Sequence, residues 1–230
     1  MTDLNAHLNE QGQPIGQFVP DWKPRPFPER VRINGRYCHL HPTNIQQESS
    51  DLFTAYSQHG KDEDWTYLPY GPFATLEQFV RVMTPLTQGN DPLFFSIIDP
   101  QTSKAMGLAS YLRMVPKFGV IEVGHLHFSR PMRRTPAATE AMYIMMRYAF
   151  EGLGYRRYEW KCDALNVPSR QAAQRLGFQY EGTFRQHLLY KGRNRDTAWF
   201  SILDSEWPAL KARFEAWLEP ANFDAQGRQR

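Results

Sequence analysis

The segment from Val120 to Ala141 holds the residues with the clearest chemical potential in the chain. Its sequence, VIEVGHLHFSRPMRRTPAATEA, is an apolar strand pattern that runs into a short basic turn and then into a helix. A helix start exposes backbone N–H groups that have no partner inside the helix, and the peptide dipoles add about half a positive charge there. Arg133 and Arg134 add fixed positive charge and forked hydrogen-bond donors just before it. These features predict a binding site for a phosphate or pyrophosphate group.

A second segment, from Tyr155 to Gly182, has the sequence YRRYEWKCDALNVPSRQAAQRLGFQYEG. It predicts a strand, a turn at Asn166, a short helix and another strand. Together the two segments resemble the acyl-CoA-binding core of the GNAT superfamily of N-acetyltransferases, and most closely its Rim-type branch. That branch acetylates the N-termini of ribosomal proteins, and its relatives act on many other amines.

The resemblance is carried by two motifs in a fixed order. In the family, a strand ends at a turn that reads Gln or Arg, two variable residues, Gly, one variable residue, and Gly or Ala, and the next helix begins A-T-E-A. The matching residues here are Arg133, Arg134, Thr135, Pro136, Ala137, Ala138, Thr139, Glu140 and Ala141. The second motif, N-x-x-S followed by a small-residue helix and R-L-G-F, is matched by Asn166, Ser169, Arg175, Leu176, Gly177 and Phe178. The resemblance covers most of the chain, from Ile33 to Leu218.

The resemblance implies an α/β (α+β) fold of the GNAT acyl-CoA N-acyltransferase type. In that fold a mixed, mainly antiparallel central sheet splays apart at the CoA site and is flanked by helices. It also implies acetyl-CoA as the acyl-donor cosubstrate, with no metal. The residues that the resemblance places against acetyl-CoA are Leu126, His127, Phe128, Arg133, Arg134, Thr135, Pro136, Ala137, Ala138, Thr139, Asn166, Ser169 and Arg175.

Pro136 departs from the family pattern, because it occupies the place where the family usually has glycine. Proline has no backbone N–H, so one donor to the pyrophosphate is missing. Its fixed φ suits the first turn of a helix. We therefore expect a preserved turn with one backbone contact fewer, which Arg133 and Arg134 would offset.

Acyl transfer from a thioester to an amine needs a deprotonated amine, a stabilised oxyanion and a proton for the leaving thiolate. Glu122 is the first candidate base, because it lies in an otherwise apolar strand and Gly124 shares its face. A partly desolvated carboxylate there would have a raised pKa. In the family pattern this position, eleven residues before Arg133, carries the base of some histone-acetylating relatives. The alternative is an exposed carboxylate, or one that pairs with an arginine.

The histidines are further candidate bases, since imidazole titrates near neutrality. His125 and His127 are expected on the face opposite Glu122, where they act either as bases or as hydrogen-bonded packing residues. His187, near the end of the sheet, is an outside candidate. None of the three has the spacing of a zinc-binding helix, so no metal site is expected.

Ser169 stands three residues after Asn166, in the first turn of the short helix. In the Rim-type relatives the matching serine is proposed to protonate the departing thiolate, and its alternative role is plain helix capping. Asn166 would anchor the pantetheine arm, or form an Asx turn before Pro168. The family fold further implies that a backbone N–H around Leu126–Phe128 meets the oxyanion, and that Arg175 reaches the adenosine phosphate or is simply solvated.

The composition of the chain limits the class of protein to which these sites belong. The chain has 230 residues, 41% hydrophobic and 14% aromatic, which supports a packed core. Its formal net charge is only +3, so nucleic-acid binding is not indicated. Cys38 and Cys162 lie in strand-like segments and are expected to be buried thiols. No apolar run reaches the roughly 20 residues that cross a bilayer, and the polar start lacks a signal-peptide core, so a cytoplasmic location is expected.

The elements that would position these residues follow from periodicity and turn chemistry. Helices are expected at 43–58, 74–87, 137–151 and 205–218, with a short one after Asn166. Strands are expected at 31–40, 93–98, 105–115, 119–128, 178–190 and 197–203, and near Tyr158. The predicted organisation is an extended proline-rich arm (residues 1–30), one GNAT acyltransferase domain (31–218) and a flexible tail (219–230).

The sequence thus predicts an N-acyltransferase that moves an acetyl group from acetyl-CoA to a primary amine by direct attack. The acceptor is a protein N-terminus, a lysine or a small amine, and another donor such as succinyl-CoA stays open. The alternatives are a non-catalytic CoA-binding sensor or assembly protein and, from RRYEWK and KGRNRD, a nucleic-acid-associated module. A homodimer through the arm or the C-terminal hairpin is also open.

Overall fold

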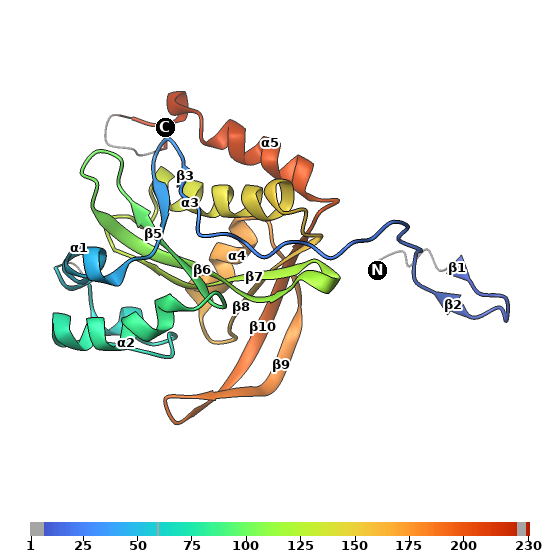
Figure 1. Ribbon diagram of the computed structural model, residues 1–230, viewed down its shortest axis with the longest axis horizontal. Coiled ribbons are helices and arrows are strands. Elements are labelled where there is room, and N and C mark those ends of the chain that lie inside the picture. The colour runs from blue at the N-terminus through green and yellow to red at the C-terminus, as the bar shows by residue number, and fades with distance from the viewer. Residues whose placement is uncertain (1–6, 59, 225–228) are drawn as a thin grey trace.

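The computed structural model describes residues 7–58, 60–224 and 229–230, and their centre is one eight-stranded sheet (Figure 1). The strand order is β3-β4-β5-β6-β7-β8-β10-β9, and every pairing is antiparallel except that of β7 with β8. Its strands are β3 (Ile33–Asn34), β4 (His39–Pro42), β5 (Leu93–Ile98), β6 (Ala105–Val115), β7 (Val120–Phe128), β8 (Arg157–Asp163), β9 (Gln179–Tyr190) and β10 (Arg193–Leu203). The mixed, mainly antiparallel sheet is the fold class that the sequence predicts.

Helices cover both faces of this sheet (Figure 1). They are α1 (Ile45–Ser57), α2 (Leu76–Gln88), α3 (Pro136–Arg147), α4 (Val167–Arg175) and α5 (Trp207–Trp217). Side chains of α1 and α2 form one apolar cluster with β5 and β6, whereas α3, α4 and α5 contribute to the larger cluster on the other face. The two faces therefore have separate cores, with the sheet between them.

Helix starts follow the capping chemistry expected of their sequences. Asn44 caps α1 by accepting from Gln46 N at 3.1 Å, and Thr75 caps α2 by accepting from Gln78 N at 3.2 Å. Each cap satisfies an orphan N–H of the first turn and is worth about 1 kcal/mol. Helix α3 lacks such a cap, which matters for the site described below.

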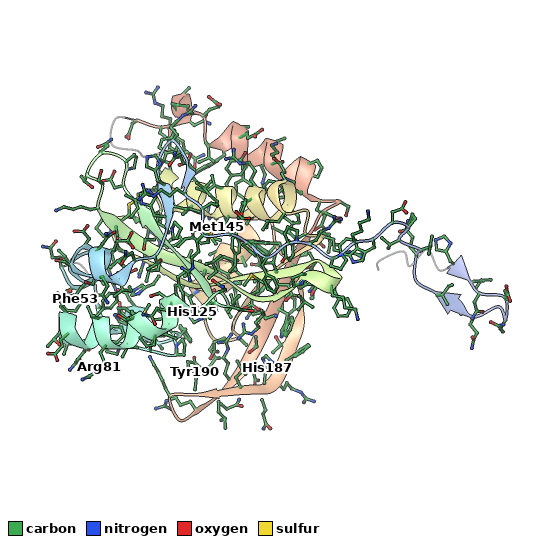
Figure 2. The ribbon with its side chains drawn as sticks, in the orientation of Figure 1. Phe53, Arg81, His125, Met145, His187 and Tyr190 are labelled. Carbon is green, nitrogen blue, oxygen red and sulfur yellow. The ribbon has the colours of Figure 1, made fainter. Side chains whose placement is uncertain are left out.

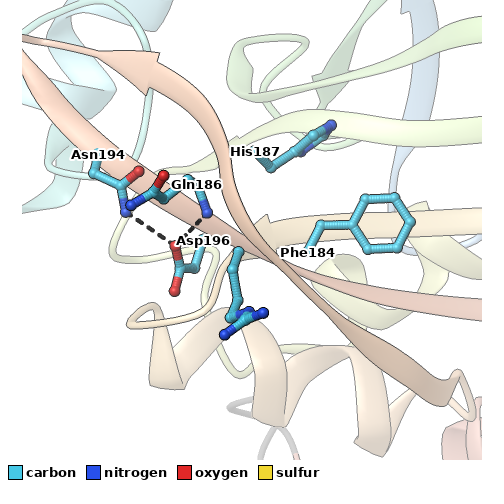
Figure 3. A pocket seen from close by; sticks show the side chains of 6 residues that line it. Phe184, Gln186, His187, Asn194 and Asp196 are labelled. Atoms are coloured by element: carbon cyan, nitrogen blue, oxygen red, sulfur yellow. Dashed lines mark hydrogen bonds between the residues drawn. The ribbon is translucent and has the colours of Figure 1, made fainter.

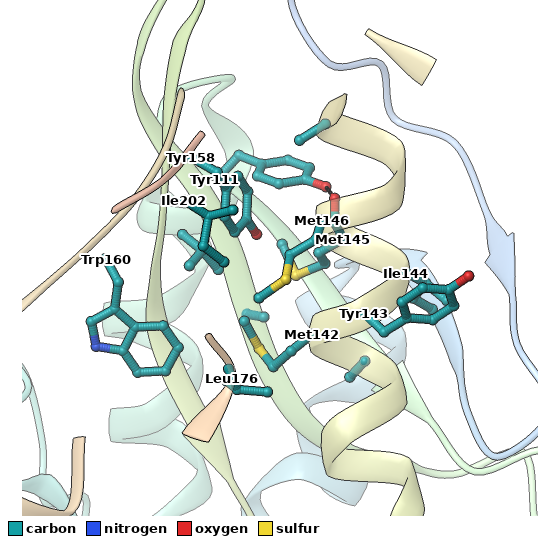
Figure 4. Packing of buried hydrophobic residues seen from close by; sticks show 14 of the residues in the cluster. Tyr111, Met142, Tyr143, Ile144, Met145, Met146, Tyr158, Trp160, Leu176 and Ile202 are labelled. Carbon is teal, nitrogen blue, oxygen red and sulfur yellow. Dashed lines mark hydrogen bonds between the residues drawn. The ribbon is translucent and has the colours of Figure 1, made fainter. Parts of the chain in front are cut away.

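The larger core is built on α3, whose central residues are buried almost all round (Figure 4). Met142, Met145 and Met146 fill the space between α3 and the sheet, and the Tyr111 hydroxyl donates to Met145 O at 2.6 Å. A helix buried on all sides cannot slide or tilt without opening cavities. The first turn of α3 is therefore held in a fixed place relative to β7 and β8.

The N-terminal arm lies against the body from Trp22 onward. Trp22 Nε1 donates to Lys117 O at 2.8 Å, and the Tyr155 hydroxyl donates to Pro26 O at 3.1 Å. N-terminal to this part of the arm, β1 (His7–Leu8) and β2 (Pro14–Ile15) form a small hairpin that projects from the body (Figure 1). The predicted arm spans residues 1–30, of which residues 1–6 lie outside the described part of the chain.

At the other end, Phe223 is buried against Tyr37 and Trp217. The predicted tail, 219–230, therefore has an ordered start, and residues 225–228 lie outside the described residues. Across the residues that the structure describes, no helix is both long and apolar enough to cross a membrane.

Candidate active site

Strand β7 carries a bulge at His125, and the bulge changes which residues share a face. Gly124 pairs with Ser110 and His127 with Leu108, so β7 has one residue more than β6 between these pairs. His125 is the extra residue, with φ of 51°. Because a bulge resets the alternation of side chains, His125 and His127 lie on the same face as Glu122. The predicted placement of the two histidines on the opposite face is therefore wrong.

Glu122 is buried on this face and is held by two cations. Its Oε1 lies 2.6 Å from Arg113 Nη1 and its Oε2 lies 2.8 Å from Lys161 Nζ. Only 3% of the Glu122 side chain is exposed. Of the roles that the sequence left open for Glu122, pairing with an arginine is thus observed. Oε1 accepts a charged hydrogen bond from Arg113, whereas Oε2 has the Lys161 ammonium nearby but no hydrogen-bond partner.

The ion pairs continue along the sheet beyond Glu122. Lys161 Nζ also lies 2.7 Å from Glu159 Oε2, and Arg157 joins Glu159 to Glu181. The Lys161 ammonium stands 3.8 Å from the centroid of the Trp199 ring, so one of its faces is covered. Charges buried in this way need such partners, since an unpaired one would be costly.

His125 and His127 are both pinned by aromatic residues. The Tyr70 hydroxyl is 3.1 Å from His125 Nδ1, and burial together with Arg113 lowers the pKa of His125 to about 4. The His127 ring stacks on Tyr56 with centroids 4.0 Å apart, and burial together with Arg133 lowers its pKa to about 3. Both rings are neutral at pH 7, and their contacts are those of packing residues.

Strands β7 and β8 separate halfway along their length. Their parallel pairing runs only from Val120 opposite Arg157 to Val123 opposite Trp160, although both strands continue. Further on, β7 pairs with β6 alone, and Ser129 N donates to Met106 O. Since ladder hydrogen bonds alternate along a strand, the N–H of Phe128 points toward the gap. The splay predicted for this fold is present.

The basic turn between β7 and α3 is tied to the loop at residues 62–65. Arg133 Nε donates to Phe128 O at 2.9 Å and its Nη1 lies 2.7 Å from Asp64 Oδ1. Arg130 pairs with the same carboxylate at 2.9 Å. Arg134 adopts a left-handed conformation with φ of 62°, and its side chain is exposed. Of the two predicted phosphate-binding arginines, Arg133 thus has a protein partner, whereas Arg134 faces solvent.

Helix α3 begins at Pro136, one residue before the expected start at residue 137, and its first turn is uncapped. Thr135 occupies the cap position, but its hydroxyl donates backward to Met132 O at 2.6 Å and caps no N–H of the helix. The N–H groups of Ala137 and Ala138 consequently have no helical acceptor. Such an end, with its positive dipole, is suited to an anion.

Thr139 and Arg175 lie next to this turn. Thr139 is buried, and its hydroxyl accepts from Arg175 Nη1 at 3.2 Å. Burial and the nearby Arg213 lower the pKa of Arg175. The guanidinium therefore stays close to the start of α3 instead of extending freely into solvent.

Asn166 and Ser169 are placed by α4. Asn166 Oδ1 accepts from Ser169 N at 3.1 Å and so caps the helix. Trp160 Nε1 donates to Ser169 Oγ at 3.0 Å. Because an indole N–H can only donate, this bond does not use the serine's own hydrogen, and Cys162 is a further hydrogen-bond partner of the hydroxyl. Trp160 is the last residue of β8 that pairs with β7, so Ser169 stands at the point where the strands part.

Residues that sequence reasoning missed complete the site. Asp64 lies in a loop that the sequence marks only by its aromatic residues, and its role depends on contacts with residues more than sixty positions away. Although burial alone would raise the pKa of Asp64, hydrogen bonds from Arg130 and Arg133 hold it well below its usual range. In the sequence, the run of three acids at Asp62, Glu63 and Asp64 is the feature that could have indicated a partner for the arginines of the basic turn.

We expect Asp64→Asn to lower the free energy of unfolding by about 1 kcal/mol at pH 7, since it removes charge-assisted bonds to two half-exposed arginines. A depressed carboxyl pKa stabilises the fold above the unfolded pKa of about 4, and the contribution disappears as the pH falls further. Urea unfolding of the variant and the wild type between pH 3 and pH 7 measures the difference. A difference that does not shrink at low pH would contradict this account of Asp64.

A pocket opens on the hairpin of β9 and β10 (Figure 3). It has a volume of about 940 Å³ and is lined by Phe184, Arg185, Gln186, His187, Asn194 and Asp196. The His187 ring is 6.0 Å from that of Trp199, which covers Lys161. The pocket wall is thus connected to the ion pairs of Glu122 through one aromatic ring.

Comparison with known proteins shows the family to which the chain belongs. Residues 44–179 match the model of the acetyltransferase (GNAT) domain, which is more than half of the chain. This protein therefore belongs to the GNAT family of acetyltransferases.

Individual relatives agree with this assignment. A crystal structure of a GCN5-related N-acetyltransferase from Brucella melitensis is 49% identical, with a TM-score of 0.89 over 92% of this chain and 96% of that chain. An uncharacterized N-acetyltransferase, p20, from Bacillus licheniformis is 29% identical over 71% of this chain and 92% of its own length. A ribosomal-protein-S5-alanine acetyltransferase from Vibrio fischeri has the same fold, with 19% identity and a TM-score of 0.58 over 77% of this chain and 98% of that chain.

Proposed function

We propose that this protein transfers an acetyl group from acetyl-CoA to a primary amine. The observation that carries the proposal is the uncapped start of α3 beside the gap between β7 and β8. The start of α3 suits the pyrophosphate of acetyl-CoA, and the gap between the strands suits its extended pantetheine arm. The basic turn connects these two parts of the site.

In the proposed complex, the N–H groups of Ala137 and Ala138 bind the pyrophosphate. Arg134 is the cation free to contact it directly, whereas Arg133 orders the turn through Phe128 O and Asp64. Arg175, held at Thr139, adds positive charge at the same end of α3. Thr135 and Pro136 shape the approach, and the donor missing at Pro136 is offset by these arginines.

The gap between the strands would take the pantetheine arm. Pairing of β7 with β8 ends at Val123, so in the stretch from Leu126 through His127 to Phe128 an N–H that points toward β8, such as that of Phe128, has no strand partner there and can pair with an extended chain. Asn166, at the start of α4, would border the arm from the other side. One N–H of this stretch is then placed to meet the oxygen of the thioester carbonyl as charge develops on it.

The chemistry is direct attack by a neutral amine on the thioester carbon. Glu122 would orient the attacking amine or a water on its face of the sheet, and Ser169 would give a proton to the sulfur as the C–S bond breaks. Trp160 donates to the Ser169 oxygen, so this bond does not use the serine hydrogen. Cys38 and Cys162 are buried, and burial raises the pKa of each thiol, so neither is expected to form a covalent acyl intermediate.

The family indicates a primary amine as the acceptor but does not choose among the kinds of amine. A protein N-terminus, a lysine and a small amine all present the required primary amine, and a cytoplasmic setting supplies each of them together with acetyl-CoA. Since the proposed contacts are to the phosphates and the arm, another acyl group such as succinyl is compatible with the same site.

Thr135→Asp tests the cofactor site by opposite effects on stability and binding. Aspartate at this position can cap Ala137 or Ala138 and favours the helix dipole, so we expect it to stabilise the fold by about 0.5–1 kcal/mol. The same carboxylate competes with the pyrophosphate for these N–H groups and repels its negative charge. We therefore expect acetyl-CoA to bind about 100-fold more weakly. Calorimetric titration with acetyl-CoA and urea unfolding measure the two effects.

Thr135→Asn is the matched control, because asparagine caps the helix without adding charge. It should stabilise the fold similarly and weaken acetyl-CoA binding much less. If the wild type binds acetyl-CoA, and Thr135→Asp binds it equally well, the pyrophosphate does not lie at α3. If the wild type does not bind acetyl-CoA, succinyl-CoA or CoA, the proposed function is wrong.

A further inference from the structure

The reaction needs a group that removes a proton from the incoming ammonium, and most candidates are already engaged. Glu122 Oε1 accepts from Arg113 Nη1 at 2.6 Å, and Oε2 forms an ion pair with Lys161 Nζ at 2.8 Å. The His127 ring is buried and stacks on Tyr56, and the half-buried His125 ring stacks on Tyr70, whose hydroxyl lies 3.1 Å from His125 Nδ1. A base for the acceptor must instead be reachable from solvent on the face that the acceptor approaches.

His187 meets this requirement. It lies on β9 in the wall of the open pocket, on the hairpin that extends from the body (Figures 2 and 3). Its ring packs edge-on against Phe184, with centroids 5.6 Å apart, and stands 6.0 Å from Trp199. Aromatic walls around an imidazole favour contact with the cationic head of an amine.

The orientation of the ring is fixed by Thr197. The His187 Nδ1 atom is 3.0 Å from Thr197 Oγ1, and this oxygen also accepts from Arg195 Nε at 3.1 Å. The Thr197 hydroxyl is buried and has lone pairs for both donors. We assign the Nδ1–H tautomer on this basis, which leaves Nε2 as the atom able to accept a proton.

The charges around His187 favour its neutral form. Its charged surroundings include Arg195 on β10, Arg113 on β6 and Lys161 on β8, and the carboxylate of Glu122 on β7. Desolvation and then these three cations lower the pKa of His187, and Glu122 opposes them. At pH 7 the ring is therefore mostly unprotonated and ready to act as a base.

We propose that His187 is the general base that deprotonates the acceptor amine, an inference that rests on the proposed function. Nε2 takes one proton from the ammonium, and the freed nitrogen lone pair forms the C–N bond with the thioester carbon. The C–S bond then breaks, its electron pair leaves on the sulfur, and the sulfur takes the second proton of the amine through Ser169 or water. His187 returns its proton to solvent, so the products are the amide, CoA thiol and one proton.

His187→Gln tests this assignment, because glutamine keeps a polar side chain but cannot take up a proton. The acceptor is the most active of a panel of short peptides with free α-amines, lysine and spermidine, with CoA release followed by a thiol reagent. We expect kcat/KM at pH 7.5 to fall about 100-fold while the acetyl-CoA Kd stays within about twofold. The acid limb of the wild-type profile, with an apparent pKa below 6.5, should disappear and leave only the ionisation of the amine.

Two further variants make the result decisive. Added imidazole should restore part of the rate in His187→Gly, and His41→Gln, on the distant strand β4, should keep wild-type kinetics. The proposal is overturned if His187→Gln keeps the rate and the acid limb, or if its acetyl-CoA affinity falls in parallel with its activity. Wild-type protein that binds acetyl-CoA but acetylates no amine overturns the proposed function, and this inference with it.

Discussion

Replacement of Glu140 by glutamine is expected to lower the free energy of unfolding by about 2–4 kcal/mol. Glu140 is a buried carboxylate on α3, and it accepts three backbone N–H groups from one turn. Its Oε1 accepts from Arg36 N at 2.9 Å, and its Oε2 accepts from Tyr37 N at 2.6 Å and from Cys38 N at 2.9 Å. Glutamine offers one acceptor oxygen and places an NH₂ group against a donor, so at least one buried N–H loses its partner.

The Glu140 contacts join α3 to the turn between β3 and β4, so the loss is not confined to one side chain. A Cβ added at Gly35 would lie 2.5 Å from Glu140 Oε2, which shows how closely the backbone wraps this carboxylate. Glu77→Gln, on the exposed first turn of α2, is the matched control and should change stability by less than about 0.5 kcal/mol. Urea unfolding measures both, and equal midpoints for the two variants would contradict this account.

Lys161→Met is expected to lower the free energy of unfolding by about 3 kcal/mol and to reduce acetyl transfer further. Lys161 Nζ lies 2.8 Å from Glu122 and 2.7 Å from Glu159, and its side chain is 7% exposed. Methionine has a similar length but no charge, so two buried carboxylates lose the cation between them. Glu122 would then be free to move toward Arg113 and away from the position that it has in the site.

Lys211→Met provides the control for Lys161→Met. Lys211 pairs with Glu151 at 2.8 Å, but both side chains are more than 30% exposed. Its loss should cost less than about 1 kcal/mol, because exposed pairs are screened by water. Adding Glu159→Gln to Lys161→Met should recover part of the lost stability by removing one uncompensated charge. Equal effects of the two lysine variants would show that the buried cluster adds no stability beyond that of an exposed pair.

Local pattern predicted much of the fold and part of the site. The order of strands and helices from residue 93 to residue 203, the start of α3 to within one residue and the burial of both cysteines follow from periodicity, proline chemistry and composition. Each of these depends on residues close together in the chain. The two motifs that indicate acyl-CoA binding are local in the same way, which is why they could be recognised without coordinates.

The bulge at His125 could not be predicted, because a bulge is a property of two strands. Whether β7 has one residue more than β6 depends on how Gly124 and His127 meet their partners. The consequence is large, since one extra residue exchanges the faces of every side chain after it. It brings both histidines to the side of Glu122, where they pack against residues of α1 and of the loop that follows it.

By itself, the sequence determined the class of protein, the order of its elements and the exposed N–H groups at the start of α3, because these depend on neighbouring residues and on backbone groups that every helix exposes. Only the tertiary structure decided how the charged side chains are used. Arg133 is tied to Asp64, Glu122 to Lys161 and Arg113, and Glu140 to a turn about a hundred residues away. The physical reason is that a buried charge takes whichever opposite charge or donor the packing brings within hydrogen-bond distance, and sequence separation does not limit that choice.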